Sequence, residues 1–277
     1  MEQFIKQHPQ LILDIYPDLK KNPNFFKNAC VIDPGMIQYA APCIYQDSQL
    51  ILDIINKIIE KYGDNGGSDD YIDSLLINFK YLGSIESSLL ANSNFAIRLC
   101  KLHWEGLRHC FTRIQNDYET VIQIGHGDIA WTNFKYIHPN LRENLDIFKL
   151  YFKSWFLTLC DKFNFDEIYH HVSSDFINKK EVALFILKYD HDYFEKLSND
   201  NRNDDDILKA VCLSPIYVDE YVVAEFEHPL KFVKEGHHLL TNKIFARDCV
   251  SNTGLALEYF PSFQDDVDIA WLAIKSA

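Results

Sequence analysis

The chain has 277 residues, 47% of them hydrophobic, so it is long and apolar enough to bury a large core, which excludes a disordered protein. Its 40 acidic against 27 basic side chains give a formal net charge of -13, which opposes contact with nucleic-acid phosphates and anionic membranes. No stretch approaches the roughly 20 apolar residues of a membrane-spanning helix, and the start MEQFIKQHPQ has no apolar core typical of a secretory leader. The seven cysteines are scattered along the chain. We therefore expect a cytoplasmic protein with reduced thiols.

In chain order, residues 1–21 come first and are expected to form an N-terminal cap. From residue 22 on, a polar residue repeatedly precedes an apolar run whose apolar positions recur three and four apart, the period of a helix. These predicted helix starts are mostly 22 to 27 residues apart, with longer gaps after the sixth and the eighth, and lie near Asn22, Asp47, Asp69, Asn92, Asp117, Asn144, Lys179, Asp205, Asn242 and Asp265. A short aromatic segment follows each run, so the spacing predicts one helix-turn-helix unit per interval.

Two segments show the repeat most clearly. FFKNACVIDPG at 25–35 returns as IFARDCVSNTG at 244–254, and both contain a cysteine in the helix and a glycine after it. We expect a residue in the left-handed conformation to close each helix near that glycine. The predicted fold is all-α: a single α-solenoid domain over residues 1–277, in which residues 22–277 hold about ten degenerate repeats of about 25 residues.

Two polar segments interrupt the pattern and are expected to be surface loops. They are GDNGGSDD at 63–70 and NDNRNDDD at 199–206. The first could offer oxygen ligands to a hard cation from Asp64, Asn65, Ser68 and Asp69, but it lacks the bidentate Glu and the spacing of a helix-loop-helix calcium site. A solvated turn is the favoured interpretation of both.

The segments NACVIDPGMIQYAAPCIYQDSQLILDII at 28–55 and DCVSNTGLALEYFPSFQDDVDIAWLAI at 248–274 resemble a helical repeat family of unknown function from giant viruses, protists and intracellular bacteria. Its units read roughly acid-x-Glu, apolar helix, Gly and Ala-Leu-x-Tyr-Ala. The resemblance is good over 241–277, fair over 22–57 and 116–150, and weak between. It implies a stacked all-helical array and brings no catalytic residues.

The most enzyme-like string is HGDIAWTNF at 126–134, which is similar to small-molecule phosphotransferases of the aminoglycoside and choline kinase type. That resemblance would make Asp128 the acceptor of the substrate proton and Asn133 a magnesium ligand. The sequence upstream shows neither the phosphate-covering loop nor the lysine-bearing strand of these enzymes. The second metal-binding aspartate, expected in an apolar strand, could only be Asp146, which lies in a helical setting. The repeat explains the same residues as a helix end and a turn, so the phosphotransferase is kept as the alternative.

The segment CKLHWEGLRHC at 100–110 holds four residues that could bind zinc. Five cysteines, however, follow an apolar residue by four positions, which predicts one buried face of a helix; they are Cys30, Cys100, Cys160, Cys212 and Cys249. Core packing is therefore favoured over a metal, and Cys110 is the least explained thiol.

The adjacent pairs His170–His171 and His237–His238 are expected to be solvated or capping residues, and Asp190, His191 and Asp192 are expected to form a turn.

Aromatic residues are assigned to packing first. The tryptophans fall in or beside predicted helices, and five tyrosines of the short second helices are expected to be half-buried; these tyrosines are Tyr39, Tyr136, Tyr193, Tyr217 and Tyr259. With no catalytic, cofactor-binding or metal residue assigned, we expect a protein-binding scaffold, virion component or host-directed factor. Its acidic balance favours a partner with a basic surface.

Overall fold

The computed structural model describes residues 5, 7–62, 67–80, 89–127, 130–158, 169–190, 192–213 and 228–276. All regular elements in these ranges are helices, and none of the described residues lies in a strand, so the predicted all-α class is confirmed. The chain divides into two compact units, Met1–His171 and Val172–Ala277. Within the described ranges, no helix combines the length and apolarity needed to cross a bilayer.

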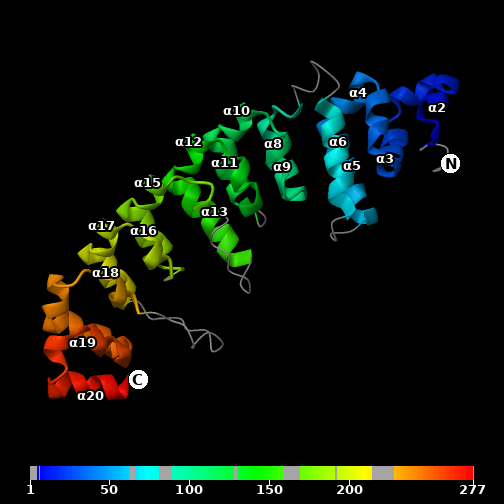
Figure 1. The fold of residues 1–277 in the computed structure, drawn as a ribbon. Helices are drawn as coiled ribbons and strands as arrows, with labels where there is room; N and C mark the ends of the chain where they lie inside the picture. The colour runs from blue at the N-terminus through cyan, green and yellow to red at the C-terminus, as the bar shows by residue number, and fades with distance from the viewer. Residues whose placement is uncertain are drawn as a thin grey trace. The chain divides into compact units, whose positions relative to one another are not determined.

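The described part of the first unit consists of α-helices, most of them labelled in Figure 1, and of three short 3-10 helices. In chain order its elements are α2 (Pro9–Ile15), η1 (Pro17–Lys21), α3 (Pro23–Ile32), η2 (Pro34–Tyr39), α4 (Pro42–Tyr45), α5 (Ser48–Tyr62), α6 (Gly67–Lys80), α8 (Ser93–Leu102), α9 (Gly106–His109), α10 (Thr112–Gln115), α11 (Tyr118–Gly125), η4 (Ala130–Tyr136), α12 (Pro139–Arg142) and α13 (Leu145–Thr158).

The second unit is built from the same kinds of element. They are α15 (Ser174–Ile177), α16 (Lys180–Ile186), η5 (Asp192–Lys196), α17 (Asn199–Arg202), α18 (Asp205–Leu213), η6 (Pro229–Phe232), η7 (His238–Thr241), α19 (Lys243–Asn252), η8 (Gly254–Tyr259), η9 (Pro261–Phe263) and α20 (Val267–Lys275).

Neighbouring helices pack in the order in which the chain makes them. In the first unit α3 packs on α5 and α5 on α6, while α8 packs on α11 and α11 on α13 (Figure 1). In the second unit α16, α18, α19 and α20 follow one another in the same way. Large side chains such as Phe26, Phe95 and Tyr151 are fully buried between these helices, and the Tyr151 hydroxyl donates to the Val121 carbonyl oxygen at 2.9 Å. Apolar burial of this kind supplies most of the stability of a helical fold.

Three helices begin with the same asparagine cap. Asn22, Asn92 and Asn242 have φ between -94 and -88° and ψ between 108 and 119°, and their side chains accept the N–H of the residue three positions on. An asparagine in this extended conformation satisfies one of the backbone donors that every helix start leaves unpaired. The local sequence therefore fixes where these helices begin.

The C-caps of the same helices lie eleven residues after the N-caps, and their backbone conformation differs from the predicted one. The C-caps Asp33, His103 and Thr253 are extended, with φ of -143, -132 and -150°, and among the described residues only Gly236 has a positive φ. The expectation of a left-handed closing residue at 33–35 and 252–254 was wrong. The physical reason is that the next helical segment follows at once: Asp33 ends α3 and also caps η2 by accepting the Gly35 N–H, and an N-cap residue adopts the extended conformation.

Most residues named as lying near a helix start are N-caps, and three helices begin one or two residues from the named position. Helix α6 begins at Gly67 instead of Asp69, Asp204 rather than Asp205 accepts the first N–H groups of α18, and Asp266 rather than Asp265 caps α20. Neighbouring aspartates can cap equally well, so the sequence could not choose between them.

The polar segment at 199–206 is helical rather than a loop. Residues Asn199–Arg202 form α17, and Asp205 and Asp206 lie in the first turn of α18. Acidic side chains in a first turn stabilise a helix because they lie near the positive end of its dipole. Of the other expected loop, residues 67–70 form the first turn of α6, and residues 63–66, with Asp64 and Asn65, lie outside the described ranges.

Candidate functional site

A cluster of buried and partly buried polar side chains lies in the first unit, around the segment 103–109. Helix α8 ends at His103, and α9 turns back against it because Gly106 has no side chain: a Cβ there would meet the Cα and the N atom of Cys100 at 3.0 Å. This close approach brings the rings of His103 and His109 to a centroid distance of 5.8 Å. A glycine at this point is therefore what allows the two imidazoles to share one site.

Both imidazoles face one carboxylate oxygen. Asp73 of α6 places Oδ1 at 3.1 Å from His103 Nε2 and at 2.8 Å from His109 Nε2. The two histidines are only 2% and 3% exposed, whereas Asp73 is partly exposed, so the cluster opens to solvent on the side of the carboxylate. The other oxygen of Asp73, Oδ2, lies 3.6 Å from Arg108 Nη1.

A second carboxylate lies near the other ring nitrogen of His103. Asp69, one helical turn before Asp73 on α6, has Oδ1 at 3.5 Å from His103 Nδ1. Both ring nitrogens of His103 therefore face carboxylate oxygens, and this buried ring lies between two acidic groups. We refer to Asp69, Asp73, His103 and His109 as the His–Asp cluster.

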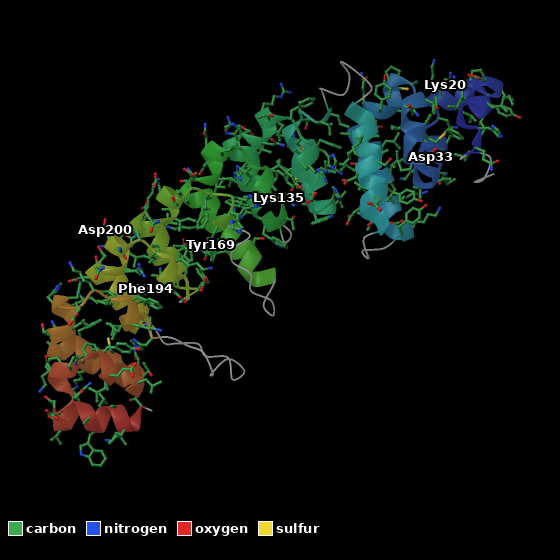
Figure 2. All side chains as sticks on the ribbon, viewed as in Figure 1. Lys20, Asp33, Lys135, Tyr169, Phe194 and Asp200 are labelled. Atoms are coloured by element: carbon green, nitrogen blue, oxygen red, sulfur yellow. The ribbon has the colours of Figure 1, made fainter. Side chains whose placement is uncertain are left out.

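Glu105 anchors the same segment on its other side. Its carboxylate accepts from Lys135 Nζ at 2.6 Å and from Arg108 Nη1 at 3.2 Å. Burial opposes ionisation of Glu105, but the hydrogen bonds from Lys135, Tyr136 and Arg108 outweigh it, and the pKa of the carboxyl lies below its usual range. Lys135, labelled in Figure 2, is also over the Trp104 and Tyr136 rings at 5.9 and 5.0 Å.

Residues of helix η4 also hold the segment 103–109 in place. The Asn133 side chain is fully buried, and its Oδ1 accepts the Leu107 N–H at 2.8 Å, while the Thr132 hydroxyl donates to the Trp104 carbonyl oxygen. Asn133, the magnesium ligand of the phosphotransferase alternative, thus has its oxygen committed to backbone. Asp128, the other residue of that alternative, lies outside the described residues.

The cysteines of this region do not join the histidines. Cys100 is buried, and burial raises the pKa of its thiol well above the usual value. Cys110 is also buried, and its Sγ donates to the Gly106 carbonyl oxygen at 3.6 Å. The expected buried cysteine face is confirmed for Cys30, Cys100, Cys212 and Cys249, and Cys160 lies outside the described ranges.

A second group of two histidines and an aspartate occurs in the second unit. His238 Nε2 lies 3.0 Å from Asp205 Oδ2, and His237 Nε2 lies 3.7 Å from the other oxygen. Both ring nitrogens of His237 are already used by backbone, because Nδ1 accepts the Leu239 N–H at 3.4 Å and Nε2 lies 3.0 Å from the Asn203 carbonyl oxygen. The expected capping role of His237 is confirmed, and the ring of His237 is committed to backbone atoms.

Two further histidines cap short helices in the same manner. His138 and His228 each precede a proline, and Nδ1 of each accepts the backbone N–H two residues on. Asp190 likewise accepts the Tyr193 N–H at 3.1 Å, which fits the expected turn, and His191 lies outside the described residues.

The aromatic assignments hold only in part. Tyr39, Tyr136 and Tyr259 are half-buried as expected, Tyr193 is buried, and Tyr217 lies outside the described ranges. Trp104 and Trp271 are 42% and 60% exposed, so packing is the wrong assignment for these two tryptophans. Trp104 lies in the turn between α8 and α9, and Trp271 lies on the side of α20 that faces solvent, which the spacing along the chain does not reveal.

Asp73 was not predicted as a site residue from the sequence, because it lies 30 and 36 residues from the two histidines it meets. One signal was present: Asp69 and Asp73 are four residues apart, which places both carboxylates on one face of a helix. Comparison of the chain with family models, curated proteins and solved structures finds no match.

Proposed function

We propose that this protein is a non-catalytic, helical-repeat protein that binds another protein. The single observation that carries the proposal is the face that α20 turns to solvent. Val267, Trp271 and Ile274, one or two turns apart on one side of the helix, are 69%, 60% and 67% exposed. The opposite side buries Ile269 and Ala273, where α20 packs on α19 and η8.

A continuous apolar stripe of this kind is typical of an interaction surface, because exposed aliphatic and aromatic side chains gain free energy when a partner covers them. Leu255 of η8 is exposed as well. The exposed carboxylates of Asp265 and Asp268 lie beside the stripe in sequence, so a partner with basic groups around an apolar centre fits best.

The recurring caps support the repeat part of the proposal. Asn22 and Asp47, like Asn92 and Asp117, are 25 residues apart, and each is an N-cap. We propose an α-solenoid of about ten such degenerate repeats over residues 22–277, in a single domain with residues 1–21 as its cap. We also propose that the chain is related to the helical repeat family that it resembles. Arrays of this type present extended binding surfaces. The buried amide of Asn133 lends no support to the phosphotransferase alternative.

The test compares affinity capture by the full chain with capture by two variants. Trp271→Asp places a charge in the stripe, whereas Leu11→Asp changes an exposed apolar residue of the other unit and serves as the matched control. We expect one protein to be retained by the parent and by Leu11→Asp, to be lost with Trp271→Asp, and to be weakened by added salt. Equal retention by all three chains, or no enriched protein, would contradict the proposal.

A further inference from the structure

We propose that the His–Asp cluster is a site for one divalent transition-metal ion of the zinc type, with His103 Nε2, His109 Nε2 and the Asp73 carboxylate as ligands. The three ligand atoms lie within 4.8 Å of one another, and all come from the first unit. The inference is independent of the protein-binding function proposed above.

The hydrogen-bonding capacity of His103 gives the first argument. A neutral imidazole carries one N–H and one lone pair, yet both nitrogens of this buried ring face carboxylate oxygens, at 3.1 Å from Asp73 and 3.5 Å from Asp69. Whichever nitrogen holds the proton, the other directs its lone pair at an anion. A lone pair facing a carboxylate in a buried site is repulsive, so the neutral ring is not satisfied by the protein alone.

A metal ion removes this conflict. Placed between Nε2 and Asp73, it accepts the lone pair of His103, and the proton on Nδ1 then faces Asp69 Oδ1, which lies 3.5 Å away and forms no hydrogen bond with Nδ1 in this structure. A slight approach of Asp69 would give the carboxylate–histidine–metal arrangement, in which an outer carboxylate fixes the tautomer and the orientation of the ligating ring. Asp69 is thus a positioning residue, and Arg108, 3.6 Å from Asp73 Oδ2, faces the oxygen that the two histidines do not use.

The distances fit the ion after a small expansion. With bonds of about 2.0 to 2.1 Å to nitrogen and oxygen, tetrahedral ligands are about 3.3 Å apart. The observed separations of 3.1 and 2.8 Å from Asp73 Oδ1 to the two Nε2 atoms are shorter by a few tenths of an ångström. Three protein ligands leave a fourth position on the partly exposed side of Asp73, where a water molecule or another ligand can bind.

The ligand types select the class of ion. Two imidazole nitrogens and one carboxylate suit zinc and its neighbours, whereas magnesium and calcium prefer all-oxygen sites. The cysteines of 100–110 are not needed, because Asp73 supplies the third ligand. No metal residue was predicted from the sequence, because the cluster forms only when α6 packs beside the end of α8 and α9.

The site is held by its surroundings, as a metal site requires. Asn133 fixes the Leu107 N–H, Lys135 and Arg108 fix Glu105, and Gly106 lets α9 approach α8. These contacts place both histidines without using the ring nitrogens that face Asp73. The second group, at Asp205, lacks this property because both nitrogens of His237 meet backbone atoms.

The test is zinc titration of chelator-treated full-length chain, by competition with a chromophoric chelator, together with its thermal unfolding. We expect one zinc ion per chain, a higher Tm with zinc, and no effect of magnesium at equal concentration. Asp73→Asn should weaken zinc binding at least about 100-fold, and Asp69→Asn by about 10-fold, since outer-carboxylate changes typically cost 10- to 100-fold.

The matched control is Asp205→Asn, which alters the other histidine–aspartate group and should leave stoichiometry and affinity unchanged. His109→Gln should also lose the ion; if that buried substitution prevents folding, the near-isosteric Asp73→Asn decides alone. The proposal is overturned if the parent chain binds no zinc, if Asp73→Asn binds it as tightly as the parent, or if only Asp205→Asn loses it.

Discussion

Replacing His228 by asparagine is expected to remove an acid-sensitive step in the stability of the chain. His228 is 6% exposed, its ring stacks on Tyr259 at 5.4 Å, and its Nδ1 accepts the Leu230 N–H at 3.2 Å. Protonation would consume that lone pair and bury a charge. Burial accordingly lowers the pKa of His228 from 6.5 to about 4, although the Glu258 carboxylate offsets part of the effect.

The direction and size of the effect follow from proton linkage. Because the folded pKa is below the unfolded one, the unfolded chain binds more protons between pH 6.5 and pH 4, and stability is lost as the pH falls through that window. At about 1.4 kcal/mol per unit of pKa difference, the loss from this residue is about 2 kcal/mol at pH 5 and about 3 kcal/mol at pH 4.

The measurement is urea unfolding of the parent chain and of His228→Asn at pH 7 and pH 5, followed by circular dichroism. Asparagine can still cap η6 but does not titrate, so any constant cost of the substitution cancels when the two pH values are compared. We expect the parent to lose about 2 kcal/mol more than the variant. NMR titration of the histidine Cε1–H signals gives a second readout, in which one imidazole of the parent stays neutral at pH 5. Equal losses in both chains would refute the reasoning.

Three further predictions concern packing and reactivity. Gly125→Ala should destabilise the chain by about 1 to 3 kcal/mol in urea unfolding, because a Cβ there would lie 2.8 Å from Tyr151 Cε2; unchanged stability would show that α13 can shift to make room. Asn133→Ala should cost about 1 to 3 kcal/mol in the same measurement by leaving the Leu107 N–H unpaired in the interior, whereas a loss below 0.5 kcal/mol, as for an ordinary surface change, would contradict that role. Brief alkylation followed by peptide mapping should modify the exposed Cys43 before the five buried cysteines of the described ranges, and early labelling of any buried one would contradict its packed position.

The helix starts were predictable because a cap is a local feature. Asn22, Asn92 and Asn242 meet their N–H partners within three residues, so a short window of sequence contains the whole interaction. The same holds for the period of apolar positions, which predicted the buried cysteine face correctly. Where two acids adjoin, as at Asp204 and Asp205, both satisfy the same local rule and the window cannot choose.

The helix ends were not predictable from the same window. Thr253 precedes Gly254, a pattern typical of a left-handed closing turn, yet it is extended because η8 begins directly after it. Asp33 is followed by Pro34, which favours extended backbone at the preceding residue, and it is extended where η2 begins. The conformation of these residues depends on where the next element must pack. Exposure follows the same logic: Trp271 and Ile269 are two residues apart on α20, and only the position of α19 and η8 decides which one is buried.

The sequence by itself determined that this chain is helical, where most of its helices begin and which cysteines face inward, since these features depend on neighbours within about four residues. Tertiary structure alone decided that Asp73 meets His103 and His109, which lie 30 and 36 residues further along the chain. Distances between residues so far apart in sequence are set by how α6 and α9 pack, and packing is a property of surfaces in contact rather than of any one segment. The sequence offered His103 and His109 as residues that could bind zinc, but their meeting with Asp73 belongs to this second category.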